Sequence, residues 1–277
     1  MSADWITLER RDGVAHLRMN RPPVNQFDSP FLEAILAAVS TVGPETRALV
    51  VGSDFDGCFA AGGDIPWMAK ASLEEAAPFV ALCQETYTYF ERLSCPTIAA
   101  IDGHCLGGGL ELSLCCDIRV VSEASSLGLP EANVGLIAGA GGTQRLVRAI
   151  GQGVARDMLL TGRRISGAEA IAFGLASRLA PDGESTRVAL EIAAGLADGP
   201  AEAIAATKRL AVAASELPIE EGLARERAEW AAMRVSASSQ EGLDAFAERR
   251  KPDFDAARAR EARASGNRGG GPDDALR

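Results

Sequence analysis

The chain has 277 residues, with 28 Lys and Arg against 38 Asp and Glu, so its formal net charge is −10. Such an acidic chain argues against broad binding of nucleic acids, because phosphate contacts need clustered Lys and Arg. Only two histidines are present, His16 and His104, so one chain cannot supply a three-His zinc site and offers few candidates for a His-based triad.

Strands and helices are predicted to alternate over roughly the first 180 residues. Short apolar runs predict strands at Trp5–Arg10, Val14–Met19 and Ala48–Gly52, and a helix is expected from Pro30 to Val42, with Ser29 as its N-cap and Gly43 ending it. The same signals predict further helices at Leu73–Leu93, Gly109–Cys116 and Thr143–Ile150, and strands at Thr97–Ile101, Ile118–Val121 and Ser126–Leu129. This alternation is typical of an α/β protein.

The last third of the chain changes character. From Glu184 it consists of Ala-rich amphipathic stretches, which predict helices at Thr186–Leu196, Ala201–Ala214, Ile219–Val235 and Gln240–Arg250. We therefore expect a core over residues 1–195, a helical region over 196–264, and a disordered polar, Gly-rich tail over 265–277.

The cysteines and the hydropathy pattern predict a soluble, cytoplasmic protein. None of the six cysteines forms a CxxC pair, and all sit among apolar neighbours, as reduced cysteines do in a core. The start, MSADWITLERRDG, lacks the apolar segment of a signal peptide, and no stretch approaches the roughly 18 apolar residues of a membrane span.

Three Gly-rich passages carry the strongest functional signal. They are Phe59–Ile65 (FAAGGDI), Asp102–Glu111 (DGHCLGGGLE), and Leu129–Gly135 (LPEANVG) running on to Gly139–Leu146 (GAGGTQRL). A triple Gly before a helix leaves backbone N–H groups free to bind an anion or a developing oxyanion, although each passage alone could equally make tight turns. GxxxxGK[ST] is absent and GAGGT is only a partial GxGxxG, so we reject nucleotide binding of those types.

Taken together, these passages resemble the crotonase superfamily, and specifically enoyl-CoA hydratase. The family order is an FxAGxD segment, a GGGxE segment, a PE segment and a GxGGTQRL segment, and all four occur here in that order. The resemblance extends from Asn20-Arg21-Pro22 to the stretch 248–254. It implies a spiral of repeated ββα units, followed by C-terminal helices that mediate trimer contacts.

The resemblance also implies an activity and its residues. The activity is hydration of a trans-2-enoyl-CoA to a 3-hydroxyacyl-CoA, with Glu111 taking a proton from the attacking water and Glu131 delivering one to C2. The N–H groups of Gly63 and Gly108 would hold the thioester enolate oxygen. The family usually has Ala where Gly63 stands. No metal or redox cofactor is expected, since coenzyme A is part of the substrate.

Contacts to coenzyme A are expected on the same ground. The resemblance places them at Pro23, Val24, Ala61, Asp64 and Ile65, and it assigns Phe246 and Arg249 to the CoA of a neighbouring subunit in a homotrimer or a dimer of trimers. The family often has a Lys after the Asp-Ile pair, near the CoA phosphates; here Pro66 stands there. Arg249 would supply part of the missing contact.

Two rival functions follow from the same residues. An enoyl-CoA isomerase needs one acid–base carboxylate, usually that at Glu131, so the presence of Glu111 favours a hydratase. A non-catalytic relative would bind CoA or RNA, but the helix after residue 73 carries Glu74, Glu75, Glu85 and Glu91, which argues against RNA. The acyl chain length and the pathway are not encoded in these motifs.

Overall fold

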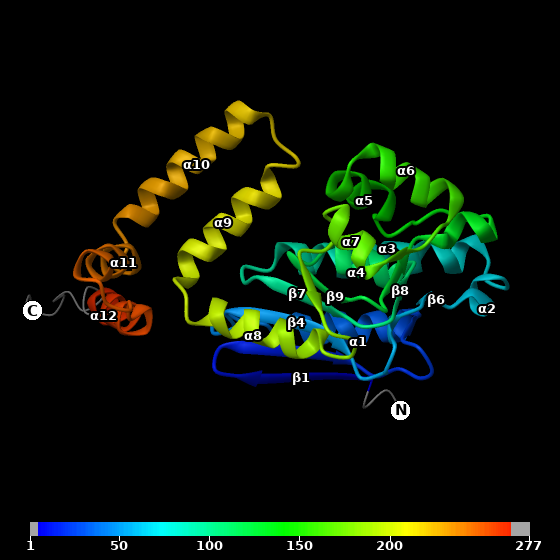
Figure 1. The fold of residues 1–277 in the computed structure, drawn as a ribbon, viewed down its shortest axis with the longest axis horizontal. Helices are drawn as coiled ribbons and strands as arrows, with labels where there is room; N and C mark the ends of the chain where they lie inside the picture. The colour runs from blue at the N-terminus through cyan, green and yellow to red at the C-terminus, as the bar shows by residue number, and fades with distance from the viewer. Residues whose placement is uncertain (1–4, 267–277) are drawn as a thin grey trace, which may run out of the picture. The chain divides into compact units, whose positions relative to one another are not determined.

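The computed structural model, which describes residues 5–266, divides the chain into two compact units. The first ends at Ala197 and the second begins at Asp198. Figure 1 shows the first unit as a layered arrangement of strands and helices. The described part of the second unit consists of helices.

Sheets organise the first unit. A six-stranded sheet has the order β1-β2-β4-β7-β9-β12, a four-stranded sheet the order β11-β10-β8-β5, and β3 pairs with β6. The strands are β1 (Ile6–Arg11), β2 (Val14–Met19), β3 (Gln26–Phe27), β4 (Ala48–Ser53), β5 (Cys58–Ala60), β6 (Gly62–Gly63), β7 (Thr97–Ile101), β8 (His104–Leu106), β9 (Ile118–Ser122), β10 (Ser126–Gly128), β11 (Ile165–Ser166) and β12 (Arg178–Ala180).

The helices between these strands are mostly short. They are α1 (Ser29–Val39), α2 (Ile65–Met68), α3 (Leu73–Arg92), α4 (Gly108–Leu114), the 3₁₀ helix η1 (Pro130–Val134), α5 (Gly142–Ile150), α6 (Gln152–Thr161), α7 (Gly167–Ala172) and α8 (Ser185–Ala197). The second unit contains α9 (Ala201–Ala213), α10 (Ile219–Arg234), α11 (Ala237–Glu248) and α12 (Phe254–Gly266).

The strands follow a repeating ββα path. The first strands of successive pairs, β4, β7 and β9, lie side by side and parallel in the six-stranded sheet, while the second strands, β5, β8 and β10, lie parallel in the four-stranded sheet. A helix follows each pair. The predicted α/β spiral of ββα units is therefore confirmed.

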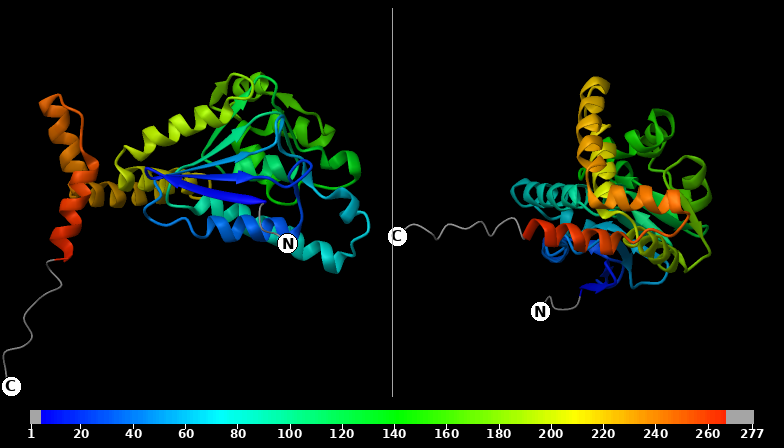
Figure 2. Two further views of the ribbon diagram at one scale, coloured as in Figure 1. Left: turned by 90° about the horizontal axis from the view of Figure 1, so that it is seen from below. Right: turned by 90° about the vertical axis from the view of Figure 1, so that its left-hand side faces the viewer.

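Alternating side chains of the central strands fill two cores. Leu49 and Val51 of β4 join the larger core, to which α1, α3 and α4 also contribute. Ala48 and Val50 face the other way and pack against Ala189 and its neighbours on α8. Figure 2 shows α8 on one side of the six-stranded sheet and α1 and α3 on the other. Burial on both faces explains the continuous apolar runs of these strands.

Several predicted boundaries were wrong by a few residues. The N-cap of α1 is Asp28, not Ser29, because its carboxylate accepts the Phe31 N–H while it also pairs with Arg21. The helix ends at Val39 rather than Val42. Ser236 caps α11, which therefore begins three residues before the predicted Gln240. The helices α6, α7 and α12 were not predicted.

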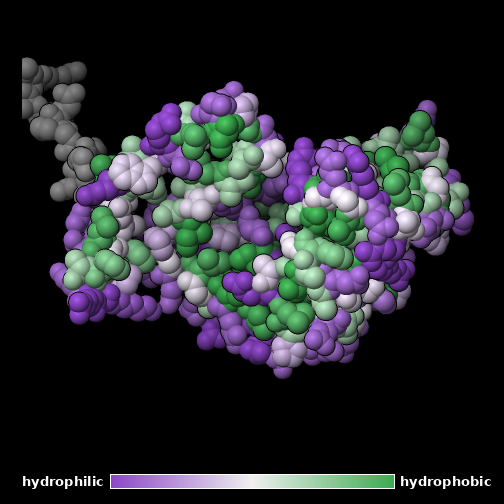
Figure 3. All heavy atoms as spheres, turned by 45° about the horizontal axis from the view of Figure 1, so that its top comes forward, coloured by the Kyte–Doolittle hydropathy of each residue, from purple (hydrophilic) through white to green (hydrophobic). Residues whose placement is uncertain are grey.

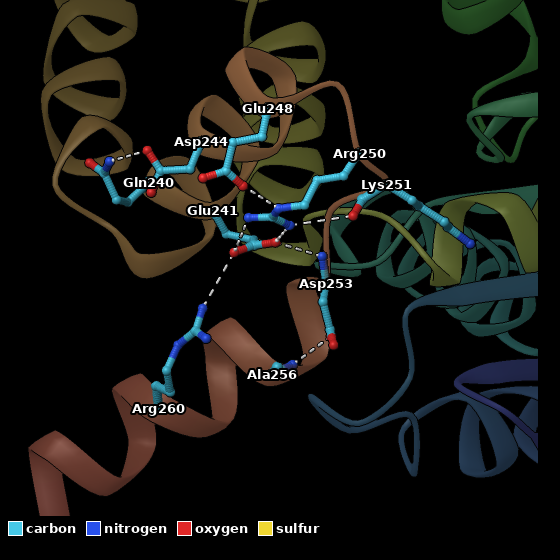
Figure 4. A network of polar contacts seen from close by, with 9 residues as sticks. All are labelled: Gln240, Glu241, Asp244, Glu248, Arg250, Lys251, Asp253, Ala256 and Arg260. Atoms are coloured by element: carbon cyan, nitrogen blue, oxygen red, sulfur yellow. Dashed lines mark hydrogen bonds and ion pairs between the residues drawn. The ribbon is translucent and has the colours of Figure 1, made fainter.

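Near the end of the second unit, the buried carboxylate of Glu241 links α11 to the segment that follows it and to α12. Glu241 of α11 accepts hydrogen bonds from Arg250, from the Asp253 backbone N–H at 2.8 Å, and from Arg260 of α12 at 3.4 Å (Figure 4). These interactions, Arg250 foremost, lower the pKa of Glu241 to about 2. The helix α12 runs to Gly266, so the first two residues of the predicted tail are helical, and 267–277 lie outside the described residues.

Large apolar side chains of the second unit remain exposed. Within this chain α10 buries none of its residues. The exposed large apolar side chains of α10, α11 and the turn between them are Ile219, Leu223, Trp230, Val235, Leu243 and Phe246. Hydrophobic patches also reach the molecular surface on the face drawn in Figure 3. Such exposure fits an oligomer contact, but the predicted trimer stays a prediction.

Candidate active site

The first unit contains a pocket of about 670 Å³ between α3, α4, η1 and the loop that follows η1. Its walls are mainly apolar, with contributions from Phe27, Ile65, Met68, Phe79, Val80, Cys83, Tyr87, Leu136 and Ile137. Two carboxylates, Glu111 and Glu131, face this apolar space together with the backbone of Gly63 and Gly108. An apolar pocket with a few convergent polar groups is the usual form of a small-molecule site.

Glu111 is held by the backbone of a distant loop. It lies in the first turn of α4 and is 4% exposed. Its Oε1 accepts hydrogen bonds from the N–H groups of Ala140 and Gly142, each at 2.8 Å. A Cβ on Gly142 would lie 2.9 Å from this oxygen, so glycine is needed for the approach. The carboxylate is thus fixed by main-chain groups.

Glu131 reaches the same pocket from the first turn of η1. Its carboxylate lies against Gly107, where an added Cβ would be 2.8 Å from Oε1. Gly107 itself has φ of 53°, a left-handed conformation that favours glycine. The Oε2 atom of Glu131 is buried and has no hydrogen-bond partner among the described residues. One oxygen of this carboxyl group is therefore left for a ligand or a proton.

The environment makes both carboxyl groups easier to protonate than in water. Burial raises the pKa of Glu111 to about 7, and the charge of Glu131 adds to this rise, while the hydrogen bonds from Gly142 and Ala140 oppose it. Burial also raises the pKa of Glu131. Two acidic groups that share an apolar site and have raised pKa values suit the exchange of protons with a substrate.

Two backbone N–H groups are available beside the carboxylates. Gly108 is the first residue of α4, so its N–H has no acceptor within the helix. Directly after β6, the Asp64 N–H donates to Phe27 O of β3 at 3.1 Å. Because N–H groups alternate along an extended chain, the Gly63 N–H points away from β3. The segments adjoin, since a Cβ on Gly62 would lie 3.4 Å from Gly108 N.

Met68 takes up the space that a side chain at position 63 would need. A Cβ on Gly63 would lie only 2.3 Å from Met68 Cε. Here the Met68 methyl group fills part of the pocket wall above the glycine. This chain has Gly63 where the family usually has Ala, and the Met68 methyl group occupies the volume that the Ala side chain would need.

A side-chain network holds the loop that positions Glu111. Arg145 of α5 donates to Ala140 O at 3.2 Å and pairs with Glu91 of α3 at 2.9 Å. From the same helix, Gln84 donates to Gly139 O at 2.7 Å. The loop is thus tied to α3 on both sides of the N–H groups that bind Glu111.

The other predicted site residues have mixed placements. Ile65 lines the pocket. Val24 and Ala61 are joined by a hydrogen bond from Ala61 N to Val24 O at 3.0 Å, but these two residues, Pro23 and Asp64 do not line the pocket. The Asp64 side chain caps α2 by accepting the Trp67 N–H. Pro66 stands in the first turn of this helix, a position that favours proline.

Phe246 and Arg249 belong to the second unit. Phe246 lies on α11 and is 86% exposed. Arg249 ends that helix in a left-handed conformation with φ of 55°. Their contact with the CoA of a neighbouring subunit stays a prediction.

Two residues with a place in this site were missed in the sequence. Arg145 stands within the GxGGTQRL motif, which was the available signal, yet its contacts with the Glu111 loop follow only from the packing of α5 on α3. Tyr87 lies in a helix whose apolar spacing indicates packing against the core. No sequence pattern shows that this residue also lines the pocket.

Within residues 5–266, no group of three or more His, Cys, Asp and Glu is arranged to hold a metal ion. In the same part of the chain, no helix combines the length and apolar character needed to cross a bilayer. All six cysteines are buried free thiols.

Known proteins share both the fold and the sequence pattern. The family model described as enoyl-CoA hydratase/isomerase matches residues 9–257. The crotonyl-CoA hydratase of Syntrophomonas wolfei is 33% identical over 257 residues, which cover 92% of this chain and 99% of the relative. The human mitochondrial methylglutaconyl-CoA hydratase is 36% identical over 254 residues, covering 89% of this chain and 75% of the relative.

A solved structure extends the likeness to the fold. The crystal structure of an enoyl-CoA hydratase from Bacillus anthracis superposes with a TM-score of 0.86 at 33% identity, covering 91% of this chain and all of that one. The ββα spiral is thus that of the crotonase fold. The chain belongs to the enoyl-CoA hydratase/isomerase family.

Proposed function

We propose that the chain is an enoyl-CoA hydratase that adds water across the 2,3 double bond of a trans-2-enoyl-CoA to give a 3-hydroxyacyl-CoA. The observation that carries this proposal is the presence of two carboxyl groups, Glu111 and Glu131, in one apolar pocket beside the free N–H group of Gly108. Relatives named as hydratases of several acyl-CoA thioesters support the reaction class.

The reaction assigns a different proton transfer to each glutamate. Ionised Glu111 takes a proton from water as the water oxygen forms a bond to C3. The π electrons move toward C2 and the thioester carbonyl, and protonated Glu131 then gives its proton to C2 as the enolate electrons return. Transfer of one proton from Glu111 to Glu131, directly or through solvent, restores the starting state. The raised pKa values of both groups support these roles.

The transient charge on the thioester oxygen needs hydrogen-bond donors that are already in place. The N–H groups of Gly63 and Gly108 fit this role, because neither requires a side chain to move and the N-terminal end of α4 adds a favourable dipole. A preorganised donor of this type typically stabilises a transition state by about 3 kcal/mol.

The remaining expectations belong to the same proposal. Pro23, Val24, Ala61, Asp64 and Ile65 would follow the CoA moiety, with Phe246 and Arg249 reaching it from a neighbouring subunit. Neither a metal nor a redox cofactor takes part in the proposed steps. The cytoplasmic location and the trimer stay predictions.

Isomerisation of a 3-enoyl-CoA is the second candidate, because the family includes both activities. It requires one carboxyl group to move a proton between C2 and C4. The hydrogen bonds that orient Glu111 into the pocket favour hydration, since an isomerase acting through Glu131 has no need of them.

An assay with three substrates tests the assignment. We expect the purified protein to remove the conjugated absorbance of crotonyl-CoA and of longer trans-2-enoyl-CoAs, with formation of the 3-hydroxyacyl products. The Glu111→Gln variant should lose this activity. If a cis-3-enoyl-CoA is isomerised efficiently by that variant while the wild type hydrates crotonyl-CoA poorly, the chain is an isomerase.

A further inference from the structure

Tyr87, which lines the pocket, carries a buried hydroxyl group that the proposed hydration does not use. It lies in α3 one helical turn after Cys83, and both residues line the pocket. The side chain is fully buried. Its hydroxyl oxygen, Oη, has no hydrogen-bond partner among the described residues.

Packing gives no reason for this hydroxyl. The Tyr87 ring packs edge-on against Phe27, with ring centroids 6.1 Å apart and an interplanar angle of 73°. A phenylalanine ring would make the same contact. Burying a hydroxyl without a partner costs the free energy of its lost hydration, so an unused Oη is a net loss to the fold.

The position of Oη relates it to the thioester site. A Cβ added to Gly108 would lie 3.1 Å from Oη, which places Oη within about 5 Å of Gly108 Cα. An oxygen that accepts the Gly108 N–H lies about 3 Å from that nitrogen. The hydroxyl and the bound thioester oxygen therefore share the immediate surroundings of one residue.

The hydroxyl can act as a donor throughout the working range of the enzyme. Burial, together with nearby acidic groups that include Cys83 and Glu111, raises the pKa of Tyr87 well above its ordinary value. The phenol therefore keeps its proton when an anion forms beside it, and it donates a hydrogen bond instead of transferring a proton.

We propose that Tyr87 Oη donates a third hydrogen bond to the thioester oxygen of bound enoyl-CoA, beside the N–H groups of Gly63 and Gly108. This assignment rests on the proposed hydratase function. Negative charge grows on that oxygen as the enolate forms, so the bond is stronger in the transition state than in the ground state and raises kcat more than it lowers KM. Tyr87 is then a catalytic residue.

The Tyr87→Phe variant removes only the hydroxyl, and Tyr89→Phe is its matched control. Tyr89 is the other tyrosine of the chain, lies on the same helix and does not line the pocket. We expect Tyr87→Phe to unfold at the same temperature as the wild type or higher, because the lost group has no partner. Its kcat for crotonyl-CoA should fall roughly 10- to 100-fold, while Tyr89→Phe keeps the wild-type value.

A spectroscopic measurement separates this proposal from the hydratase assignment. The absorbance of 4-(dimethylamino)cinnamoyl-CoA shifts to the red when its carbonyl group is polarised, and we expect a smaller shift on binding to Tyr87→Phe than to the wild type. The proposal would be overturned if the Tyr87→Phe variant showed the same red shift and the same kcat as the wild type. A loss confined to acyl chains with polar substituents would also overturn it and make Tyr87 a specificity residue. A reduced shift in a protein that hydrates nothing would support the contact and refute the hydratase.

Discussion

The two walls of the pocket are built in different ways. On one wall, backbone groups do the positioning: the N–H groups of Ala140 and Gly142 hold Glu111, and Gly107 makes room for Glu131. On the other wall, side chains of α2, α3 and the loop after η1 supply apolar surface, and several remain open to solvent, including Ile65 and Ile137.

This difference separates the chemistry from the choice of substrate. Main-chain donors keep their places when side chains change, unless a new Cβ enters their space. Apolar side chains at a partly open wall can vary without disturbing the core. Relatives of similar identity named for crotonyl-CoA and for methylglutaconyl-CoA are consistent with such a division. The following experiments test it from the largest expected effect to the smallest.

Removing either carboxyl group should have the largest effect. We expect Glu111→Gln and Glu131→Gln each to lower kcat for crotonyl-CoA by about 10²–10⁴-fold, because each loses one proton transfer. Glu111→Gln should also be more stable at pH 8, since it keeps an acceptor for the two N–H groups and removes a buried charge. Initial rates and thermal unfolding measure both effects. The exposed Glu85→Gln variant is the control and should keep the wild-type rate. A wild-type rate in either Glu111→Gln or Glu131→Gln would refute the assignment.

Adding one methyl group to the backbone wall should come next. In Gly142→Ala the new Cβ would lie 2.8 Å from Leu129 Cδ1 and 2.9 Å from Glu111 Oε1. We expect at least a tenfold loss of kcat and about 1–3 kcal/mol of destabilisation, measured by steady-state kinetics and denaturant unfolding. Gly153→Ala in α6 is the control, because nothing lies within 4 Å of its new Cβ. Equal behaviour of the two variants would show that the close approach is unimportant.

The pH dependence should reveal the buried state of Glu111. Its pKa of about 7 predicts that kcat/KM rises tenfold per pH unit below that value, because the ionised form accepts the proton from water. The folded state holds this proton more tightly than the unfolded state, so this group's contribution to the free energy of unfolding decreases as pH rises from about 4.5 to about 7. Rate and unfolding profiles measure both trends. An acidic limb that persists unchanged in Glu111→Gln would assign it to another group.

Changes to the apolar wall should be the mildest. Ile137 is 77% exposed at the pocket. We expect Ile137→Ala to raise KM for a long trans-2-enoyl-CoA a few-fold, since each lost CH₂ contact is worth up to about 0.8 kcal/mol, and to leave kcat for crotonyl-CoA within twofold. Paired kinetics on the short and long substrates test this. An equal loss on both substrates would show that the walls are not independent.

The sequence predicted the architecture better than its details. Apolar runs at Ala48–Gly52 and Thr97–Ile101 indicated buried strands, and the structure places both in the six-stranded sheet. The prediction of Ser29 as the N-cap of α1 was wrong, because Asp28 and Ser29 are both residue types that favour this position and only the geometry of the Phe31 N–H distinguishes them. The helix α12 escaped prediction because its residues show little apolar periodicity.

The site was predictable where motifs name residues. The two glutamates and two glycines quoted from the motifs line one pocket in the structure. The roles of Arg145 and Tyr87 were not predictable, because they depend on which helices pack together. Arg145 pairs with Glu91, which lies 54 positions earlier in the chain. Tyr87 lies close to Gly108 because α3 packs against α4.

The amino-acid sequence by itself determined the α/β class, the family and the residues able to perform acid–base chemistry, since strand periodicity and short ordered motifs are local properties of the chain. The tertiary structure alone decided which backbone groups hold Glu111, why Gly63 is compatible with Met68, and that Tyr87 carries an unpaired hydroxyl. These features depend on burial and on contacts between segments far apart in the chain, which set pKa values and hydrogen-bond partners that no local pattern contains.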